Sequence, residues 1–318
     1  MSTQELPSKV AVVGAGLVGS TFAYALAQSH FARQLALVDE HQPGRARGEA
    51  RDLGHALPFI GSLAIEAGGY EVCQGAHLVV LAAGAAQKPG ETRLDLAKKN
   101  TAIIQGIVPQ VLAAAPDALL LVVANPVDVL TYAAWRTSGL PPERVFGSGT
   151  GLDTARFRYE LASHCHLDPT NVHGYVLGEH GDSEVMLWSG VRLGGQSLEE
   201  YCPVCGRGCG PTVRGTVEER VRRAAYEIID LKGATNWAIG SALTHLAGVV
   251  LRDRHSIVTV STLVSGRPGW PTAHLSLPVV LGREGVERVW LPPLAPEEEK
   301  ALAASARVLR ETLDSVGL

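Results

Sequence analysis

The stretch Gly14-Ala15-Gly16-Leu17-Val18-Gly19 follows an apolar run, Val10–Val13, and opens an amphipathic segment over residues 16–29. In such a strand–turn–helix unit the first glycine permits a tight turn, the second lets the backbone approach a pyrophosphate, and the third lets helix and strand pack closely. The free N–H groups at the start of the helix attract phosphate. The stretch therefore predicts a dinucleotide site formed by Gly14, Gly16, Leu17, Val18 and Gly19.

Asp39 identifies the dinucleotide. It follows a second apolar run, Leu35–Val38, and lies 20 residues after Gly19. A carboxylate in this place accepts hydrogen bonds from a ribose diol and repels a 2′-phosphate, so NAD is favoured over NADP. The alternative is a plain glycine turn followed by a capping aspartate, and the strand and helix patterns on either side of the turn disfavour it.

The pattern of apolar runs predicts the fold class. Two more continuous runs, 78–82 and 119–124, fit strands of a parallel sheet that is covered on both faces. Their alternation with helical stretches indicates an α/β fold, a Rossmann doubly wound parallel sheet over residues 1–147. After residues 147–150 the pattern changes to a second, α+β substrate domain over 148–318. Its expected elements are a helix over 152–164, a strand over 175–177, one long helix over 217–246, strands over 257–263 and 274–281, and a closing helix over 296–316.

Composition excludes several classes of protein. The chain has 318 residues, 46% of them hydrophobic, which is enough for a large core. The net charge is −4 and no basic run occurs, so nucleic acid is not an expected partner. Residues 1–8 lack the apolar core of a signal peptide, and no apolar stretch reaches the roughly 18 residues of a membrane span. A cytoplasmic protein without a membrane partner is expected.

Three of the five cysteines, Cys202, Cys205 and Cys209, occur close together in a segment rich in glycine and proline. Two interpretations remain open: a variable surface loop, or a metal clip with Cys165 or a histidine as the fourth ligand. Structural zinc sites usually combine two paired motifs, and this segment holds one CxxC. On that ground no metal site is expected.

A histidine between two glycines, in Gly178-Glu179-His180-Gly181-Asp182, is the strongest candidate for proton transfer. Asp153 and Arg156 lie three residues apart on the predicted helix 152–164, so they share a face. Taken alone, that pair is more typical of an ordinary surface ion pair than of a catalytic site.

Several separated motifs resemble the lactate/malate dehydrogenase family, its lactate dehydrogenase branch most closely, and together they span nearly the whole chain. They are GAGLVG at 14–19, GAAQKPGETRLDL at 84–96, ANPVD at 124–128, GSGTGLDTARF at 147–157, GEHGDSE at 178–184 and KGAT at 232–235.

The resemblance implies a role for each candidate residue. His180 is the acid–base residue, and Asp153 orients it. Arg156 grips the substrate carboxylate with both arms of its guanidinium. Arg93, at the end of a loop that closes over the substrate, polarises the reacting carbonyl. Gly84 and Asn125 bind the cofactor, Asn125 also binds the substrate, and Thr235 lines the substrate pocket with Ile239 on the same helix.

The predicted substrate depends on the residue type at Gln87. Malate-using relatives have an arginine at the matching position, where it pairs with the second carboxylate of oxaloacetate. Against a neutral Gln87 that carboxylate is left unpaired, at a cost of several kcal/mol. The resemblance therefore implies the interconversion of pyruvate and L-lactate with NAD. Malate or another 2-hydroxy acid remains the alternative substrate, and a non-catalytic NAD-binding protein the remote alternative.

Arg158 and His173 match the positions that bind fructose 1,6-bisphosphate in activated bacterial lactate dehydrogenases. The resemblance implies a homotetramer with this effector at a two-fold subunit interface, and stronger activation at mildly acidic pH, where a histidine is charged. Ordinary surface cations are the alternative. Gly151 departs from the family, which usually has a β-branched residue there, and we expect it to loosen the start of the helix.

Overall fold

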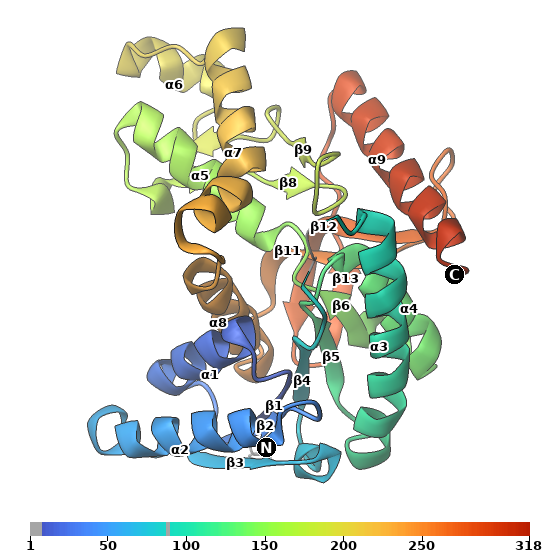
Figure 1. The fold of residues 1–318 in the computed structure, drawn as a ribbon. Helices are drawn as coiled ribbons and strands as arrows, with labels where there is room; N and C mark the ends of the chain where they lie inside the picture. Colours follow the sequence, from blue (N-terminus) through green and yellow to red (C-terminus); the bar gives the residue numbers. More distant parts are fainter. Residues whose placement is uncertain (1–7, 87–89) are drawn as a thin grey trace, which may run out of the picture.

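The computed structural model describes residues 8–86 and 90–318, and a nine-stranded sheet forms its centre. The strand order is β13-β12-β11-β6-β5-β4-β1-β2-β3 (Figure 1). The first-half strands are all parallel, in the doubly wound order, so the predicted fold class is confirmed. They are β1 (Lys9–Val13), β2 (Gln34–Val38), β3 (Ala64–Gly68), β4 (Leu78–Leu81), β5 (Leu119–Val122) and β6 (Val145–Gly147).

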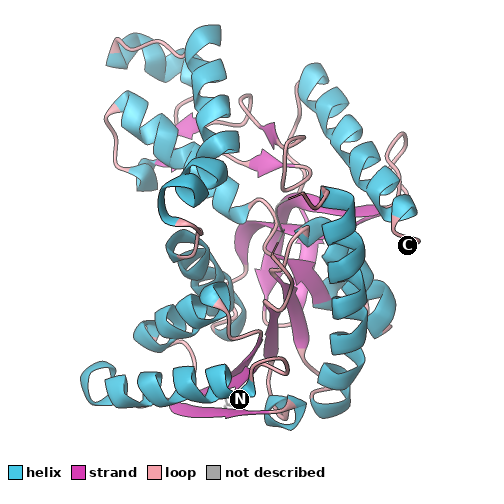
Figure 2. Ribbon diagram, in the orientation of Figure 1, coloured by secondary structure: helices cyan, strands magenta, loops and turns pink. Residues whose placement is uncertain are grey.

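Helices bury both faces of this sheet, as Figure 2 shows. Alternate residues of β1 point to opposite faces: Val10 and Val12 join one core cluster, and Ala11 and Val13 join the other. The first cluster includes residues of α1 (Leu17–Ser29), α2 (Pro43–Ile60) and α8 (Trp237–Leu251), and the second includes residues of α3 (Arg93–Ala114) and α4 (Val127–Ser138). Burial on both faces explains why the strands are continuously apolar.

The second half of the chain adds to the same sheet. β11 (Ser256–Val264) lies antiparallel to β6, and β12 (Ala273–Gly282) and β13 (Gly285–Val289) continue outward from it. The predicted strands over 257–263 and 274–281 are therefore confirmed. The resulting sheet is mixed, because these antiparallel strands extend the first-half sheet.

The remaining elements form an α+β layer above one end of the sheet. They are α5 (Gly151–Cys165), the 3₁₀ turn Pro169–Asn171, β7 (Val172–His173), β8 (Val176–Leu177), β9 (Val185–Met186), β10 (Arg192–Leu193), α6 (Leu198–Cys205), α7 (Pro211–Lys232) and α9 (Pro296–Ser315). Two other 3₁₀ turns belong to the first half of the chain: Tyr70–Cys73 lies against α3 and β2, and Pro142–Arg144 lies against β13. Over the described residues, no helix combines the length and the apolar character that crossing a membrane requires.

The predicted single helix over 217–246 is wrong, because α7 ends at Lys232 and α8 begins at Trp237. Gly233 caps α7 in the left-handed conformation, with φ of 83°. Asn236 is buried in the break, where its side chain donates a hydrogen bond to Thr21 of α1. Thr235 therefore lies in a loop between two helices, and only Ile239 is helical.

Candidate functional site

A cavity of about 600 Å³ lies at the carboxyl ends of β4, β5 and β6, where ligands bind in open α/β sheets. Its walls come from α3, α4, α5, α7, α9 and the loop over 178–184. Five residues predicted from the sequence line it together: Arg93, Asn125, Asp153, Arg156 and His180.

Asp153 links the histidine and the arginine. One carboxylate oxygen, Oδ2, lies 2.5 Å from Nδ1 of His180, and the other, Oδ1, accepts a hydrogen bond of 2.8 Å from Arg156. Asp153 and Arg156 share one face of α5 because they lie three residues apart in a helix. The side chain of Asp153 is 3% exposed, so the ion pairs form in a site largely shielded from solvent.

The loop that carries His180 is fixed on both sides. Gly178 has φ of 91° and a backbone bridge to Ser276 of β12, and a Cβ there would lie 2.6 Å from Ser305 Oγ. The backbone N–H of His180 donates a 2.7 Å hydrogen bond to Asp128. These contacts aim the imidazole at Asp153.

Burial disfavours the imidazolium form of His180, but the ion pair with Asp153 outweighs it and raises the pKa of His180 to about 9. Burial also acts against the charged form of Asp153. The positive charges and hydrogen bonds of His180 and Arg156 outweigh burial, and they hold the pKa of the Asp153 carboxyl below its ordinary value. The pair is therefore a protonated histidine and a carboxylate at neutral pH.

Arg93 is the first residue of α3, whereas the sequence placed it at the end of a loop. Thr92 caps the helix by accepting a hydrogen bond from the backbone of Asp95. The Arg93 guanidinium donates to Asp182 of the histidine loop at 2.7 Å and to the hydroxyl of Tyr226 on α7. The arginine thus joins three walls of the cavity.

Of the other residues predicted to bind the substrate, Asn125 alone is found among the described residues of the cavity wall. Asn125 lines the cavity, and its carbonyl accepts a 2.7 Å hydrogen bond from Asn100. Thr235, in the break between α7 and α8, is not among the described residues that line it. Gln87 lies outside the described residues.

The charged residues of this cavity that were missed include Asp128, Glu184 and Arg222. Asp128 is buried, and burial raises its pKa to about 6. Glu184 is 4% exposed, and burial together with the nearby Asp153 raises its pKa to about 8. Among the described residues its Oε1 has no hydrogen-bond partner. Arg222 of α7 donates to the carbonyl of Glu184 at 3.3 Å. The motifs ANPVD and GEHGDSE contain both acids, but nothing in the sequence signals that they are buried.

The glycines of the predicted cofactor site fit a dinucleotide. A Cβ on Gly19 would lie 2.0 Å from the carbonyl of Gly14, and one on Gly14 would lie 2.5 Å from the backbone of Ala83, so both positions require glycine. Around Gly16 there is open space, and no side chain caps the following helix. A pyrophosphate therefore has room at the N–H groups of Leu17 and Val18.

A second cavity, of about 360 Å³, adjoins this turn and is lined by Gly14, Asp39 and Gly84. The carboxylate of Asp39 accepts hydrogen bonds from the backbone of Ala15 at 3.2 Å and of Gln42 at 2.9 Å. Each of its oxygens keeps capacity for a further hydrogen bond, as a ribose diol needs.

Arg158 and His173 lie outside both cavities. Arg158 donates through Nε to the carbonyl of Gly174 at 3.0 Å, and its guanidinium lies 5.4 Å from the ring centre of Tyr175. This places the arginine next to β7, the strand on which His173 is exposed. Gly151 fits closely: a Cβ there would lie 3.1 Å from the carbonyl of Thr259, so a side chain would crowd β11.

Comparisons with known proteins agree with this geometry. Residues 8–147 match the model of the lactate/malate dehydrogenase NAD binding domain, and residues 150–317 match the alpha/beta C-terminal domain of the same family. The L-lactate dehydrogenase of Thermus aquaticus is 48% identical over 309 residues, covering 97% of this chain and 99% of that protein. That of Thermoanaerobacterium saccharolyticum is 47% identical over 311 residues, 98% of this chain and 100% of that protein.

Solved structures give the same result. A lactate dehydrogenase from a Medee basin deep-sea metagenome library superposes with a TM-score of 0.95 at 40% identity, covering 98% of this chain and 100% of that one. The minor L-lactate dehydrogenase of Enterococcus mundtii, in a ligand-bound form, gives 0.93 at 41% identity, covering 98% and 99%. The chain therefore belongs to the lactate/malate dehydrogenase family.

Proposed function

We infer that this protein is an NAD-dependent L-lactate dehydrogenase, which interconverts pyruvate and L-lactate. The observation that carries the inference is the His180–Asp153 pair, 2.5 Å apart, with Arg156 on the second oxygen of the same carboxylate. Relatives with this activity match over almost the entire chain, at 47% and 48% identity.

In the reducing direction, His180 donates the proton. The pKa of about 9 keeps its imidazole protonated at neutral pH, so the proton is available for the oxygen of a bound keto group. Asp153 holds the ring through Nδ1, which leaves Nε2 as the donor, and it stabilises the charge until transfer. In the opposite direction the neutral imidazole accepts the proton of the substrate hydroxyl.

Two arginines bind and polarise the substrate. Arg156 uses one nitrogen for Asp153 and presents its remaining N–H groups to the substrate carboxylate. Arg93 lines the same cavity, and by exchanging its contact with Asp182 it supplies positive charge to the developing alkoxide. Side chains lack hydride chemistry, which a bound NAD cofactor would supply. Gly14, Gly16, Gly19 and Asp39 would hold the dinucleotide.

Substrate choice is assigned to Gln87. A neutral glutamine leaves the second carboxylate of oxaloacetate unpaired, so pyruvate is the preferred keto acid. The test follows NADH oxidation with each keto acid. We expect kcat/KM for pyruvate to exceed that for oxaloacetate by about 100-fold or more. A preference for oxaloacetate would show that the protein is a malate dehydrogenase. NADH binding without turnover would show a non-catalytic NAD-binding protein.

Fructose 1,6-bisphosphate is proposed as an allosteric activator, bound by Arg158 and His173 at a two-fold interface of a homotetramer. Two phosphates require cations from both subunits, and Arg158 lies beside the strand that bears His173. A titration of activity with this effector, alongside sedimentation of the protein, tests the proposal. An apparent KM for pyruvate that does not respond to the effector contradicts activation, and a monomer contradicts the shared site.

A further inference from the structure

Four of the five cysteines lie together at the end of α5 that is remote from Asp153. Cys165 is the last residue of α5, Cys202 and Cys205 belong to α6, and Cys209 lies between α6 and α7. Figure 1 shows α6 at the edge of the molecule, near α5 and α7. Cys165, Cys202 and Cys209 pack in one apolar cluster, so the fold joins residues that are far apart in the chain.

Their thiols interact with one another. Cys209 lies close enough to Cys165 and Cys202 for the three thiols to interact electrostatically. Cys205 interacts electrostatically with Cys165, and its thiol donates to the carbonyl of Cys202 at 3.5 Å. Cys165 and Cys209 are 5% and 8% exposed. All five cysteines of the chain are free thiols.

Cysteine is the residue that this segment buries against the rest of the protein. Over residues 199–210 the single buried residue is Cys209, while Val204 is 77% exposed. The segment therefore turns Cys209 inward and leaves Cys202 and Cys205 half-buried, while the valine faces solvent.

We propose that Cys165, Cys202, Cys205 and Cys209 form a tetrathiolate site for a soft divalent cation, of which Zn²⁺ is the representative. Thiolates are the preferred ligands of such ions, and four of them complete a closed, tetrahedral structural site. Binding releases the four thiol protons to solvent and leaves a net charge of about −2. Cations stand nearby to balance it: Arg214 donates to the carbonyl of Cys209 at 3.0 Å, and Arg207 interacts with Cys165.

The four thiols lie in an open arrangement in this structure. Among the described residues, no three of these sulfurs lie within 4.8 Å of one another. Closure around an ion draws the connection between α6 and α7 toward Cys165. That connection contains Gly206, Gly208 and Gly210, and no atom lies within 4 Å of the place where a Cβ would stand on any of them. Glycine at these positions leaves room for the movement, which exchanges the contacts of His164 with the carbonyls of Arg207 and Gly208.

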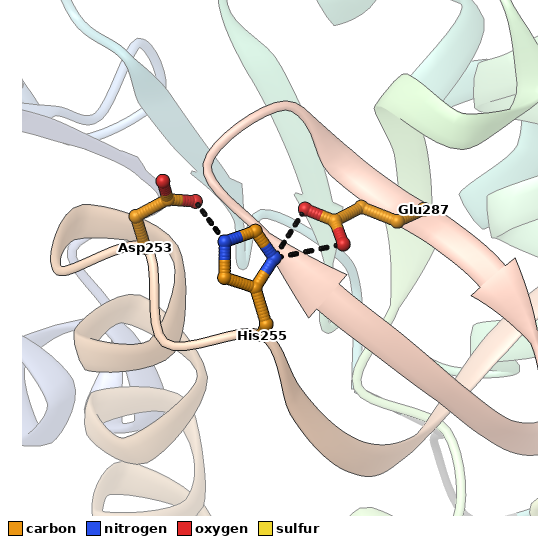
Figure 3. Close-up of side chains that lie close together, drawn as sticks. All are labelled: Asp253, His255 and Glu287. Atoms are coloured by element: carbon orange, nitrogen blue, oxygen red, sulfur yellow. Dashed lines mark hydrogen bonds and ion pairs between the residues drawn. The ribbon is translucent and has the colours of Figure 1, made fainter.

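In a second group of ligand-type residues, Asp253, His255 and Glu287, the ligand atoms do lie within 4.8 Å of one another (Figure 3). Its two carboxylates lie at opposite nitrogens of the imidazole, Glu287 at 2.8 Å from Nδ1 and Asp253 at 3.6 Å from Nε2. One cation can bind only one of these nitrogens. We therefore explain this group as a histidine that bridges two acids, and it supplies a control for the cysteine site.

The role of the cysteine site is structural. Cys165 and Asp153 lie 12 residues apart on α5, a rise of about 18 Å, so the ion stays away from the reacting atoms. It ties α6 and the start of α7 to the end of α5.

The experiment uses the full chain without an affinity tag, purified with a reductant and Zn²⁺ and then freed of loose metal. Elemental analysis is expected to find about one zinc per chain. Replacement by Co²⁺ is expected to give the intense thiolate-to-cobalt charge-transfer absorption of a tetrahedral site. Chelation under reducing conditions is expected to lower Tm by more than about 4 °C.

Substitutions locate the metal. Cys165→Ser and Cys209→Ser are expected to lower bound zinc to less than about a tenth of an ion per chain. Cys73→Ala, a cysteine in the other core, and His255→Gln, in the acidic group, are expected to keep it. Wild-type protein that binds neither Zn²⁺ nor Co²⁺ under these conditions overturns the proposal, even if the serine variants fail to fold. The proposal is also overturned if the Cys209→Ser variant still binds zinc and the His255→Gln variant does not.

Discussion

Asp153 and His180 lie 27 residues apart in the chain, and their side chains meet at 2.5 Å. α5 supplies the carboxylate, and a loop pinned to β12 and to Asp128 supplies the imidazole. Neither element holds the geometry alone. The pair therefore forms only when α5 packs against this loop, and the acid–base chemistry depends on that packing.

Replacing Asp153 with asparagine removes the charge that stabilises the imidazolium. Burial then dominates, and the pKa of His180 falls from about 9 toward or below its ordinary value. Pyruvate reduction needs the protonated ring, so the alkaline limb of its pH–rate profile should move down by about two pH units. In addition, kcat should fall by about 10²–10⁴-fold. The kcat/KM profile over about pH 5 to 10 measures both effects. Asp168→Asn, at an exposed turn, is the matched control, and an unmoved limb contradicts the role of Asp153.

Glu184→Gln tests the buried acid beside the pair. With a pKa of about 8, Glu184 is neutral at pH 6 and ionised above pH 8, where its charge favours the imidazolium of His180. The glutamine variant should keep the wild-type rate near pH 6 and lose pyruvate reduction at a lower pH than wild type does. Glu218→Gln, beside the same Arg222, should leave the alkaline limb in place. An identical limb in wild type and Glu184→Gln would refute the coupling.

The same variant has a stability signature with a defined sign. The folded-state pKa of Glu184 lies above its ordinary value of 4.5, so the native state binds the extra proton between that value and about 8. Native stability contributed by this group is therefore present at low pH and lost as pH rises through that window. Tm of Glu184→Gln relative to wild type should rise with pH and level off above about pH 8. A difference in Tm that is constant with pH argues against a protonated Glu184.

Arg156→Lys should raise the KM for pyruvate by about 10- to 100-fold, since a lysine cannot form two parallel hydrogen bonds to a carboxylate. Some loss of kcat is expected too, because the Asp153 contact goes with the guanidinium. Steady-state kinetics with pyruvate measures the change in KM and the change in kcat separately. Arg220→Lys, in an exposed ion pair with Glu160, is the control. A KM within about twofold of wild type would remove Arg156 from substrate binding.

The sequence predicted the parts of the fold that local backbone rules determine. The turn after β1 was recognised because only glycine fits at Gly14 and Gly19, where a Cβ would meet backbone atoms at 2.5 and 2.0 Å. The break between α7 and α8 was missed, since the helical pattern runs through it. What ends the helix is a left-handed Gly233 and a buried Asn236 bonded to a distant helix.

The site was predicted where its residues stand in separate recognisable motifs, as His180 and Asp153 do. Glu184 and Asp128 lie within those motifs too, but their perturbed pKa values come from burial, which only the packing of distant elements creates. The grouping of Cys165 with Cys209 is likewise a product of tertiary structure. The sequence offered Cys165 or a histidine as a fourth ligand, and a single CxxC gave too little information to choose a metal clip over a surface loop.

The effector proposal gives the last prediction, the response of Arg158→Gln. The guanidinium of Arg158 is fixed by the carbonyl of Gly174 and by the ring of Tyr175, so little side-chain entropy remains to be lost when it binds a phosphate. Fructose 1,6-bisphosphate should lower the apparent KM for pyruvate in wild type, and the glutamine variant should lose that response. His173→Gln should weaken the response, because one of the two side chains proposed to bind phosphate is lost. Activation retained in full by both variants would mean that the effector binds elsewhere.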